Sequence, residues 1–448
     1  MSSTTKYIVA VIGAGPAGLY ASKQLADEGV QVVLINRDIK PGGLAEYGIY
    51  KDKHKMKAGL RKQFRRILDS PEITYYGNVT IGEQGDLTLE ELEAMGFQAL
   101  LVTVWAQGTK WLGLPGEDQQ GVFHAKDIVY HYNDLPPFSQ QDFMIGQRVA
   151  LIGVGNVMID IAHWLIRDLK VDEVIAVARR GPAEVKFTKK EMEHVARNLD
   201  LQALDKEINR VAGYMQEVDQ DPMAAKEFIL SALPKAEEPV SESRFRFEFL
   251  ASPSKILGDE DGKVCGLEVE DTKLIPRNGD TKAERLGTTR VLDVDTVIFC
   301  IGDKVDDNFG LPIEWNEFVK CPTPRYPINE VSYEAFDPQT GMPLKHIFVA
   351  GWSREASSGL VGVARKDGEM GAMAVVECLK TQEPLENIGQ VMQKLDSRLR
   401  QLDKPVVTKQ DWQRLELVEQ DEAEKRGLEA FKFKSNEEML AVIKKQKV

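Results

Sequence analysis

The chain has 448 residues and a formal net charge of −13, with 57 Lys and Arg against 70 Asp and Glu. A chain of this length is expected to form about two to four domains, each large enough to bury a core. The 43% apolar share excludes collagen-like, disordered and disulfide-scaffold classes. The acidic balance argues against a nucleic-acid binder.

The first predicted elements are a strand, a glycine-rich turn and a helix within Tyr7–Leu25. The apolar run Ile8–Ile12 is followed by a GxGxxG pattern at Gly13, Gly15 and Gly18. The first glycine permits a tight turn, the second lets backbone approach a pyrophosphate, and the third lets the helix pack on the strand. The pyrophosphate would lie at the helix N-terminus, where free N–H groups favour an anion. The glycines also interrupt the apolar stretch, so we expect no membrane span.

The second strand, Gln31–Ile35, leads to the position where a ribose-binding carboxylate usually stands, about 20 residues after the glycines. Asn36 occupies that position. An Asn side chain hydrogen-bonds a ribose hydroxyl without the charge assistance of a carboxylate. We therefore assign the ribose contact to Asn36, with Asp38 as the alternative.

The next segment is strongly basic, with a net charge of +7 inside a protein of net −13. Only Asp52 opposes its eight cations, which are Lys51, Lys53, Lys55, Lys57, Arg61, Lys62, Arg65 and Arg66. Two interpretations stay open. One is a basic helix face that partly serves cofactor phosphates, and the other is a docking surface for an acidic partner.

A second strand–turn–helix–strand unit follows the strand Leu100–Val104. Its first strand is Val149–Ile152, and its turn carries Gly153, Gly155, Asn156 and Val157. The next strand, Glu173–Val177, is followed by Arg179 and Arg180, where an NAD site would carry an acid. Guanidinium groups at this place suit the 2′-phosphate of NADP by charge and by bidentate geometry. A solvated arginine pair is the alternative.

This repeated unit predicts an α/β fold with two Rossmann-like, three-layer dinucleotide-binding domains. Further strands are expected at Thr296–Ile301 and Ile347–Ala350. The acid excess marks the middle of the chain, because residues 108–322 hold 26 basic and 38 acidic residues. We expect three segments, residues 1–107, 108–322 and 323–448, and the last ends in a charged, partly helical wrapping tail.

Cysteine and histidine spacing predicts no metal site. The four cysteines form no CxxC pair, and the six histidines show no HExxH or paired-ligand spacing. Buried thiols in a reducing compartment are the simplest interpretation, so we expect a cytoplasmic location.

Motifs over nearly the whole chain resemble those of one flavoprotein family. They are Gly13–Gly18, Tyr47-Gly48-Ile49 with Asp52 and Lys55-Met56-Lys57, Tyr76–Gly82, Leu114–Glu117, Gly155-Asn156-Val157 with Asp160, Arg179–Pro182 with Phe187-Thr188 and Glu191, Ala350-Gly351-Trp352 with Ser358-Gly359, Asp411-Trp412, and Glu437–Leu440. Together they are far more specific than either glycine turn. The family is that of the adrenodoxin-reductase-type ferredoxin–NADP reductases.

The resemblance implies FAD on the first unit and NADPH on a second unit inserted into the FAD domain. Hydride would pass from the nicotinamide to the flavin, and electrons would then pass to a small acidic carrier, a ferredoxin or flavodoxin. The implied flavin contacts are Gly43, Leu44, Gly351, Trp352 and Gly359, and the implied NADPH contacts are Asn156, Arg179, Arg180 and Glu191. Trp352 and Asp160 would be the residues nearest the reacting rings.

Besides Asn36, the sequence departs from the family pattern at three places. Lys53 replaces a His that often follows the residue equivalent to Asp52, Trp105 stands where relatives have Gly, and Ala356-Ser357 replaces an expected Gly-Pro. These changes leave two other functions open. One is a flavoenzyme that reduces a small molecule such as a quinone or oxygen, and the other is an electron-transfer subunit of a larger complex.

Overall fold

The computed structural model describes residues 7–277, 279–355 and 361–445, and the chain divides into two compact units. The first unit extends to Thr109, includes Tyr130–Gln140 and resumes at Gly302. The second unit consists of Lys110–Val129 and Gln141–Ile301. One unit is thus inserted into the sequence of the other.

The return to the first unit lies at Gly302, earlier than the expected boundary at residue 323. The reason is a short antiparallel pair between β14 (Asp303–Lys304) and β5 (Gly108–Thr109), which lie beside the last and the first of the four points where the chain changes unit. Apolar side chains between residues 302 and 322 also pack into the core of the first unit. The segment Tyr130–Gln140 belongs there as well, because its apolar residues pack with Tyr47.

The first unit is built on a sheet whose described strands have the order β17-β18-β4-β1-β2-β3-β19. The inner five strands are parallel and the two edge strands are antiparallel to their neighbours. The strands are β1 (Ile8–Ile12), β2 (Gln31–Ile35), β3 (Ile73–Gly77), β4 (Ala99–Val102), β17 (Glu334–Asp337), β18 (Met342–Val349) and β19 (Val407–Thr408), with a hairpin of β15 (Ile313–Glu314) and β16 (Glu317–Phe318). The helices are α1 (Pro16–Asp27), α2 (Leu44–Tyr47), α3 (His54–Leu68), α4 (Leu89–Met95), α10 (Val361–Leu379), α11 (Ile388–Leu399), α12 (Lys409–Arg426) and α13 (Asn436–Lys445), with short turns at η1 (Phe138–Gln140) and η6 (Gly351–Ser353).

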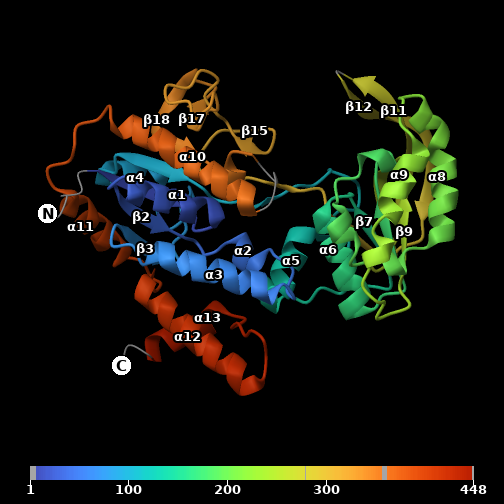
Figure 1. Ribbon diagram of the computed structural model, residues 1–448, viewed down its shortest axis with the longest axis horizontal. Coiled ribbons are helices and arrows are strands. Elements are labelled where there is room, and N and C mark those ends of the chain that lie inside the picture. Colours follow the sequence, from blue (N-terminus) through green and yellow to red (C-terminus); the bar gives the residue numbers. More distant parts are fainter. Residues whose placement is uncertain (1–6, 278, 356–360, 446–448) are drawn as a thin grey trace. The chain divides into compact units, whose positions relative to one another are not determined.

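Alternation along β1 gives this sheet two apolar faces. Val9 and Val11 point into a core formed with α1, α3, α10 and α12, whereas Ile8, Ala10 and Ile12 point into a core formed with α4 and α11. Helices α1 and α10 lie side by side on the first face (Figure 1). The unit therefore has three layers, as predicted from the sequence.

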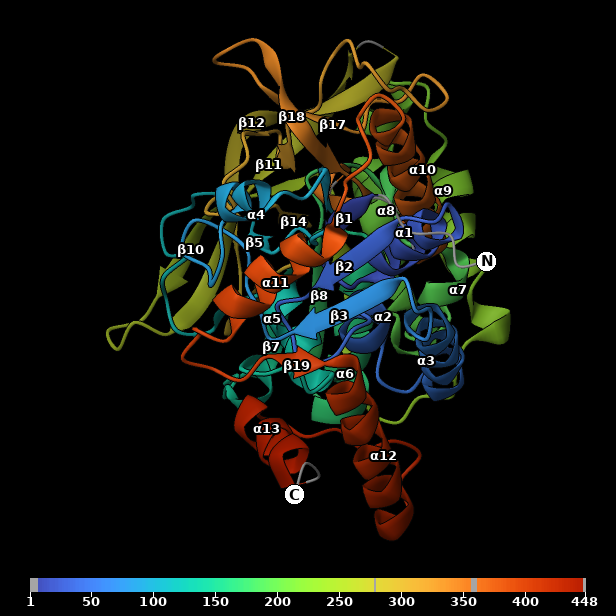
Figure 2. The same ribbon diagram turned by 90° about the vertical axis from the view of Figure 1, so that its left-hand side faces the viewer.

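The C-terminal tail is part of the first unit. Strand β19 extends the sheet by pairing with β3, and α12 and α13 lie next to each other beyond it (Figure 2). Trp412, Leu415, Met439 and Ile443 of this tail are buried in the same core as α1. The tail thus completes the core of the first unit.

The second unit has a parallel sheet of described strands in the order β6-β13-β7-β8-β9, and a separate antiparallel sheet β10-β11-β12. Its strands are β6 (Val122–His124), β7 (Arg148–Ile152), β8 (Glu173–Val177), β9 (Arg244–Glu248), β10 (Ala251–Gly258), β11 (Val264–Arg277), β12 (Asp280–Leu292) and β13 (Thr296–Phe299). Its helices are α6 (Asn156–Trp164), the π-helical turn η2 (Leu165–Leu169), α7 (Lys189–Met192), α8 (Leu201–Gln216) and α9 (Pro222–Leu230), with short turns at η3 (Pro182–Glu184), η4 (Ala196–Asn198) and η5 (Leu233–Lys235). Helix α5 (Ala125–Tyr132) spans the division between the units.

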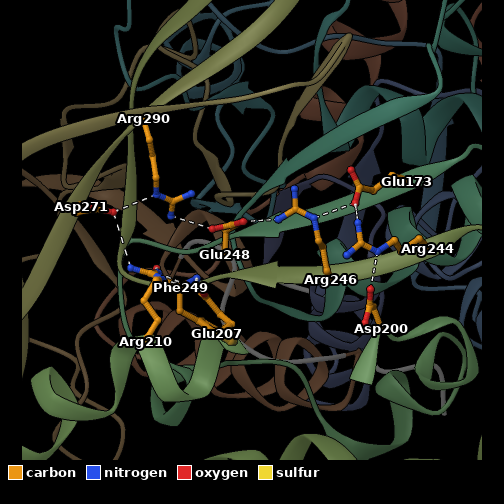
Figure 3. A network of polar contacts seen from close by, with 10 residues as sticks. All are labelled: Glu173, Asp200, Glu207, Arg210, Arg244, Arg246, Glu248, Phe249, Asp271 and Arg290. Carbon is orange, nitrogen blue, oxygen red and sulfur yellow. Dashed lines mark hydrogen bonds and ion pairs between the residues drawn. The ribbon is translucent and has the colours of Figure 1, made fainter. Parts of the chain in front are cut away.

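Alternating charges join β9 to the elements around it (Figure 3). Arg246 on β9 pairs with Glu173 of β8 at 2.9 Å, and Glu248 pairs with Arg290 of β12 at 2.8 Å. The nearly buried Glu207 of α8 accepts a hydrogen bond from the Phe249 N–H at 2.6 Å. These contacts fix helix α8 and the base of the β11–β12 hairpin to the parallel sheet.

Within the described residues, no helix combines the length and apolar character needed to cross a membrane.

Candidate functional site

The first glycine-rich turn connects β1 to α1, and its three glycines play different parts. A side chain at Gly13, which has φ +105°, would lie 2.8 Å from the Thr103 carbonyl oxygen, and one at Gly18 would lie 1.9 Å from the Gly13 oxygen. A Cβ at Gly15 would meet no atom of the described chain within 4 Å. Gly13 and Gly18 therefore serve the fold, whereas Gly15 leaves open space for a ligand.

The N-terminus of α1 is suited to an anion. Gly15 is its N-cap and supplies no side-chain acceptor, and Pro16 follows at the first helical position. The first-turn N–H groups carry the positive end of the helix dipole. A pyrophosphate placed beside Gly15 would meet these groups.

Asn36 braces this turn against the loop that follows β2. Its side-chain oxygen accepts from the Ala14 N–H at 3.0 Å, and its amide group donates to the Asp38 and Lys40 carbonyl oxygens at 2.9 and 3.1 Å. The residue is only 7% exposed. Because both amide hydrogens are used, a ribose contact at Asn36 is limited to its carbonyl oxygen. A carboxylate could not make the two donations.

The loop at Gly42 and Gly43 lies directly on the first turn. The Gly42 N–H donates to the Ala14 carbonyl at 2.7 Å, and a Cβ on Gly43, which has φ +48°, would lie 3.0 Å from the Gly15 Cα. Leu44 then begins the short helix α2. This arrangement explains the two glycines and keeps the loop beside the expected pyrophosphate.

Aromatic rings gather beyond the carboxyl ends of β4 and β18. Trp105 packs edge-to-face on Trp352 at 5.1 Å and on Tyr130 at 5.6 Å, measured between ring centroids. The buried Nε1 of Trp105 has no hydrogen-bond partner among the described residues. An indole N–H in this position can serve a ligand acceptor. Trp105, which stands where relatives have Gly, therefore lines the same region as Trp352.

The turn before Trp352 is held by an acidic side chain. Gly351 has φ +70°, and its N–H donates to the Asp367 carboxylate at 2.6 Å. Arg354 pairs with the same carboxylate at 2.6 Å. This fixes η6 at the end of β18. Gly359 and the Ala356-Ser357 pair lie outside the described residues.

The second glycine-rich turn, between β7 and α6, repeats the first. A Cβ on Gly153, with φ +123°, would lie 2.4 Å from the Cys300 carbonyl oxygen, whereas Gly155 faces no described atom within 4 Å. Gly155 is also the N-cap of α6 and supplies no side-chain acceptor. Asn156 follows, and its side-chain oxygen accepts from the Thr188 N–H at 2.8 Å. The turn is therefore tied to the start of α7, with Gly155 left open.

The arginines after β8 border two polar cavities of about 600 and 480 Å³. Arg180, Arg277, Asp280 and Thr281 line both cavities, and Arg179 lines the smaller one. Arg180 lies 3.8 Å from the Glu184 carboxylate and 3.7 Å from that of Asp280 on β12. Burial raises the pKa of Glu184, which Arg180 opposes. Sequence reasoning missed Asp280, because its approach to Arg180 depends on the folding of a hairpin far along the chain.

The remaining predicted residues of the second unit lie on α6 and near α7. Val157 is exposed and Asp160 is half-buried, both on α6. Glu191 lies 3.6 Å from the Nε2 of His194. The predicted NADPH contacts thus occupy the segment from the second turn to α7 and the loop after β8.

Only some of the cations in the basic segment, residues 51–66, are exposed to solvent. Lys57 is 4% exposed, Arg61 makes a bidentate contact with Glu46 at 2.6 and 2.7 Å, and Arg65 pairs with Glu416 of α12 at 2.9 Å. Of the eight proposed docking cations, Lys57 is therefore buried, and Arg61 and Arg65 are paired with carboxylates of the same unit. The exposed cations of α3 are Lys55, Lys62 and Arg66.

Glu46 is the centre of a buried charge cluster that joins the tail to the first unit. Lys40 lies between it and Glu419 of α12, at 3.3 and 2.5 Å, and Lys432 lies 3.2 Å from it. Burial alone would raise the pKa of Glu46, but these cations and Arg61 hold it well below its usual range. The cluster gives the basic helix a structural role beside any surface role.

The chain is similar in sequence and in fold to several known proteins. A sequence family described as pyridine nucleotide-disulphide oxidoreductase matches residues 7–216. The chain is 26% identical over 472 residues to the NADPH-ferredoxin reductase FprA of Mycobacterium leprae, covering 97% of this chain and 98% of that protein. It is 25% identical over 484 residues to the mitochondrial NADPH:adrenodoxin oxidoreductase of Bos taurus, covering 97% and 92%. FprA of Mycobacterium tuberculosis, solved in complex with NADPH, shares the fold with a TM-score of 0.78 and 24% identity over 98% of this chain and 99% of that one.

Proposed function

We propose that the chain is an adrenodoxin-reductase-type ferredoxin–NADP reductase, which oxidises NADPH and passes the electrons through FAD to a small iron–sulfur carrier. One observation carries the assignment of cofactors. Each unit has a glycine turn whose middle glycine faces open space at an uncapped helix N-terminus, and only the second turn is followed by paired arginines. The first turn thus suits FAD and the second suits NADPH.

Bound FAD supplies the redox chemistry, because it accepts a hydride from NADPH and releases electrons one at a time. The protein then has to bind, orient and shield. Gly13, Gly15 and Gly18 present the α1 N-terminus to the FAD pyrophosphate, and the Gly43-Leu44 loop lies beside it. Trp105 and Trp352 would exclude water beyond β4 and β18, and the Trp105 Nε1, which has no partner among the described residues, would be available to an acceptor on the cofactor.

In the second unit, Gly153, Gly155, Asn156 and Val157 present the α6 N-terminus to the NADPH pyrophosphate. Arg179 and Arg180 hold the 2′-phosphate, and their exposure beside a polar cavity supports this role. Glu191 and Asp160 complete the proposed NADPH contacts, and Asp160 is the proposed polar residue near the nicotinamide.

The deciding experiment is an anaerobic titration of the FAD-loaded protein with NADPH, followed by flavin absorbance. We expect full bleaching with about one NADPH per FAD, and much slower bleaching with NADH. Reduced enzyme is then offered ferredoxins, a flavodoxin, a quinone and oxygen in turn. Faster oxidation by a ferredoxin supports the proposal. A protein that takes up no FAD, or that prefers the quinone or oxygen, contradicts it.

For the carrier we propose docking on the exposed side of α3, at Lys55, Lys62 and Arg66. The half-exposed Met56 adds apolar contact area beside them. Cations on one helix face steer an acidic partner even when the whole protein is acidic. Lys51 and Lys53 precede the helix and extend the same basic segment.

We also propose a reducing, cytoplasmic location. All four cysteines are free thiols; Cys265 is exposed and Cys300, Cys321 and Cys378 are buried. An exposed free thiol supports a reducing compartment.

A further inference from the structure

The second unit contains a cluster of two imidazoles and a carboxylate that the NADPH site does not use. His163 lies near the end of α6, His194 follows α7, and Glu237 follows η5. The Glu237 carboxylate lies 2.7 Å from the Nδ1 of His194 and 3.7 Å from the Nε2 of His163. One ligand atom from each residue lies within 4.8 Å of the other two.

The exposed fraction of the three side chains rises from the interior of the unit to its surface. His163 is 3% exposed, His194 is 18% exposed and Glu237 is 41% exposed. The backbone also holds it together, because the Glu237 N–H donates to the Glu193 carbonyl at 3.0 Å, one residue before His194. The three side chains are thus brought together by folding, with one side open to solvent.

We propose that His163, His194 and Glu237 bind a first-row divalent metal ion, with Zn²⁺ as the best match. Two histidines and a glutamate form a ligand set that zinc accepts, with the fourth position left for water. Imidazole nitrogen also disfavours the hard cations Ca²⁺ and Mg²⁺, which prefer oxygen ligands. The separation of His163 from His194 in the sequence hides this site from any search by motif spacing.

To bind a metal ion, the three ligand atoms have to move slightly closer together. Bonds of about 2.1 Å place tetrahedral ligand atoms roughly 3.4 Å apart, so the cluster must contract by about 1.4 Å at most. The two imidazoles are stacked at 4.9 Å with an angle of 16° between their planes, and a metal has to lie in both planes. One ring must therefore turn, and His194 is the more exposed of the two.

A neighbouring carboxylate is placed to orient that ring. Glu191 lies 3.6 Å from the Nε2 of His194, on the opposite side of the ring from the Nδ1 that faces Glu237. A metal-bound histidine commonly donates its second N–H to a carboxylate, which fixes its tautomer and orientation. Arg167 lies 3.5 Å from Glu237 and competes with a cation, but the two side chains are 46% and 41% exposed, so solvent weakens this competition.

The test is equilibrium dialysis of the tag-free, FAD-loaded protein against micromolar Zn²⁺, with metal and protein measured by mass spectrometry. We expect about one Zn²⁺ per chain, a rise in melting temperature with Zn²⁺, and loss of both effects in His194→Ala and Glu237→Gln. Glu191→Gln should weaken zinc binding by about 10- to 100-fold. Glu238→Gln and His54→Ala are the controls and should bind zinc as the wild type does.

Flavin content and circular dichroism show whether each variant is folded. If the wild type retains no zinc, or if His194→Ala and Glu237→Gln retain it, the cluster is only an ion pair and the proposal is wrong.

Discussion

Asn36 and Ala14 are joined by a hydrogen bond of 3.0 Å, in which the Asn36 side-chain oxygen accepts from the Ala14 N–H. This bond ties the end of β2 to the glycine turn at the start of α1. The amide group of the same side chain holds the carbonyls of Asp38 and Lys40. An amide, and not the carboxylate usual at this position, is the group that can make all three contacts.

We expect Asn36→Asp to destabilise the protein and to speed the loss of FAD. The carboxylate cannot donate to the two carbonyls, which costs about 1–3 kcal/mol for buried groups left unpaired. The measurements are denaturant unfolding and the rate of flavin release on dilution. Gln98→Glu is the matched control. Gln98 is also a buried amide, accepting from Ile8 N–H at 3.2 Å at the other end of β1. It should lower stability without speeding flavin release, whereas slower release from Asn36→Asp would show that the ribose contact dominates.

Arg180→Ala should raise the KM for NADPH and leave the KM for NADH nearly unchanged. A hydrogen-bonded charge contact to the 2′-phosphate is worth about 1.5–3 kcal/mol, or roughly 10- to 150-fold in KM. Steady-state kinetics with both nucleotides and an artificial acceptor measure the effect. Arg197→Ala removes an arginine that pairs with the exposed Glu238 at 3.4 Å, and it serves as the control. Equal changes for NADPH and NADH would refute the phosphate assignment.

Asp280→Asn should have the opposite effect on NADPH. Its carboxylate lies 3.7 Å from Arg180, so it competes with the 2′-phosphate for the guanidinium. A backbone hydrogen bond from Thr281 and the nearby Arg180 lower the pKa of Asp280, so it is charged throughout the assay range. We expect the KM for NADPH to fall by roughly two- to fivefold at low salt, as for an exposed pair. The gain should fade as salt rises, and a rise in KM would show that Asp280 supports the site.

Features that depend on neighbouring residues were predictable from the sequence, whereas features that depend on contacts between distant segments were not. The strands Ile8–Ile12, Gln31–Ile35 and Glu173–Val177 were predicted at both ends, because each is an apolar run bounded by glycine or polar residues. The open positions at Gly15 and Gly155 follow from the same local pattern. The environments of Lys57 and Asp280 depend on segments far apart in the chain. No local sequence pattern indicates that Lys57, which lies in a basic run, is buried. Nor does one indicate that the β11–β12 hairpin brings the Asp280 carboxylate close to Arg180.

Charge reversal on α3 tests carrier docking. We expect Lys62→Glu with Arg66→Glu to lower kcat/KM for an acidic ferredoxin by about tenfold at low salt, because both cations face solvent and steer association. NADPH-dependent reduction of ferricyanide should not change. The control pair, Lys255→Glu with Lys263→Glu, makes the same change in net charge within the second unit. If the wild-type kcat/KM for ferredoxin did not change with ionic strength, electrostatic docking would be refuted.

Lys57 should make stability depend on pH. Burial, followed by the charge of Lys432, lowers the pKa of Lys57 from 10.5 to about 7, and its ammonium group donates to Asn133. Between pH 7 and 10.5 the unfolded chain binds the proton and the folded chain does not. The free energy of unfolding therefore rises with pH across this window. Below pH 7 both states are protonated, and the folded protein carries the full cost of a buried charge.

Lys57→Met removes this cost. We expect the variant to gain on the order of a few kcal/mol relative to wild type near pH 6, with the gain shrinking steadily toward pH 10. Loss of the bond to Asn133 shifts the comparison equally at every pH, so the slope is the diagnostic quantity. Denaturant unfolding at pH 6, 7.5 and 9 measures it. Lys55→Met, on the exposed side of α3, should follow the wild-type slope, and a Lys57→Met variant with that same slope would mean that Lys57 stays charged when folded.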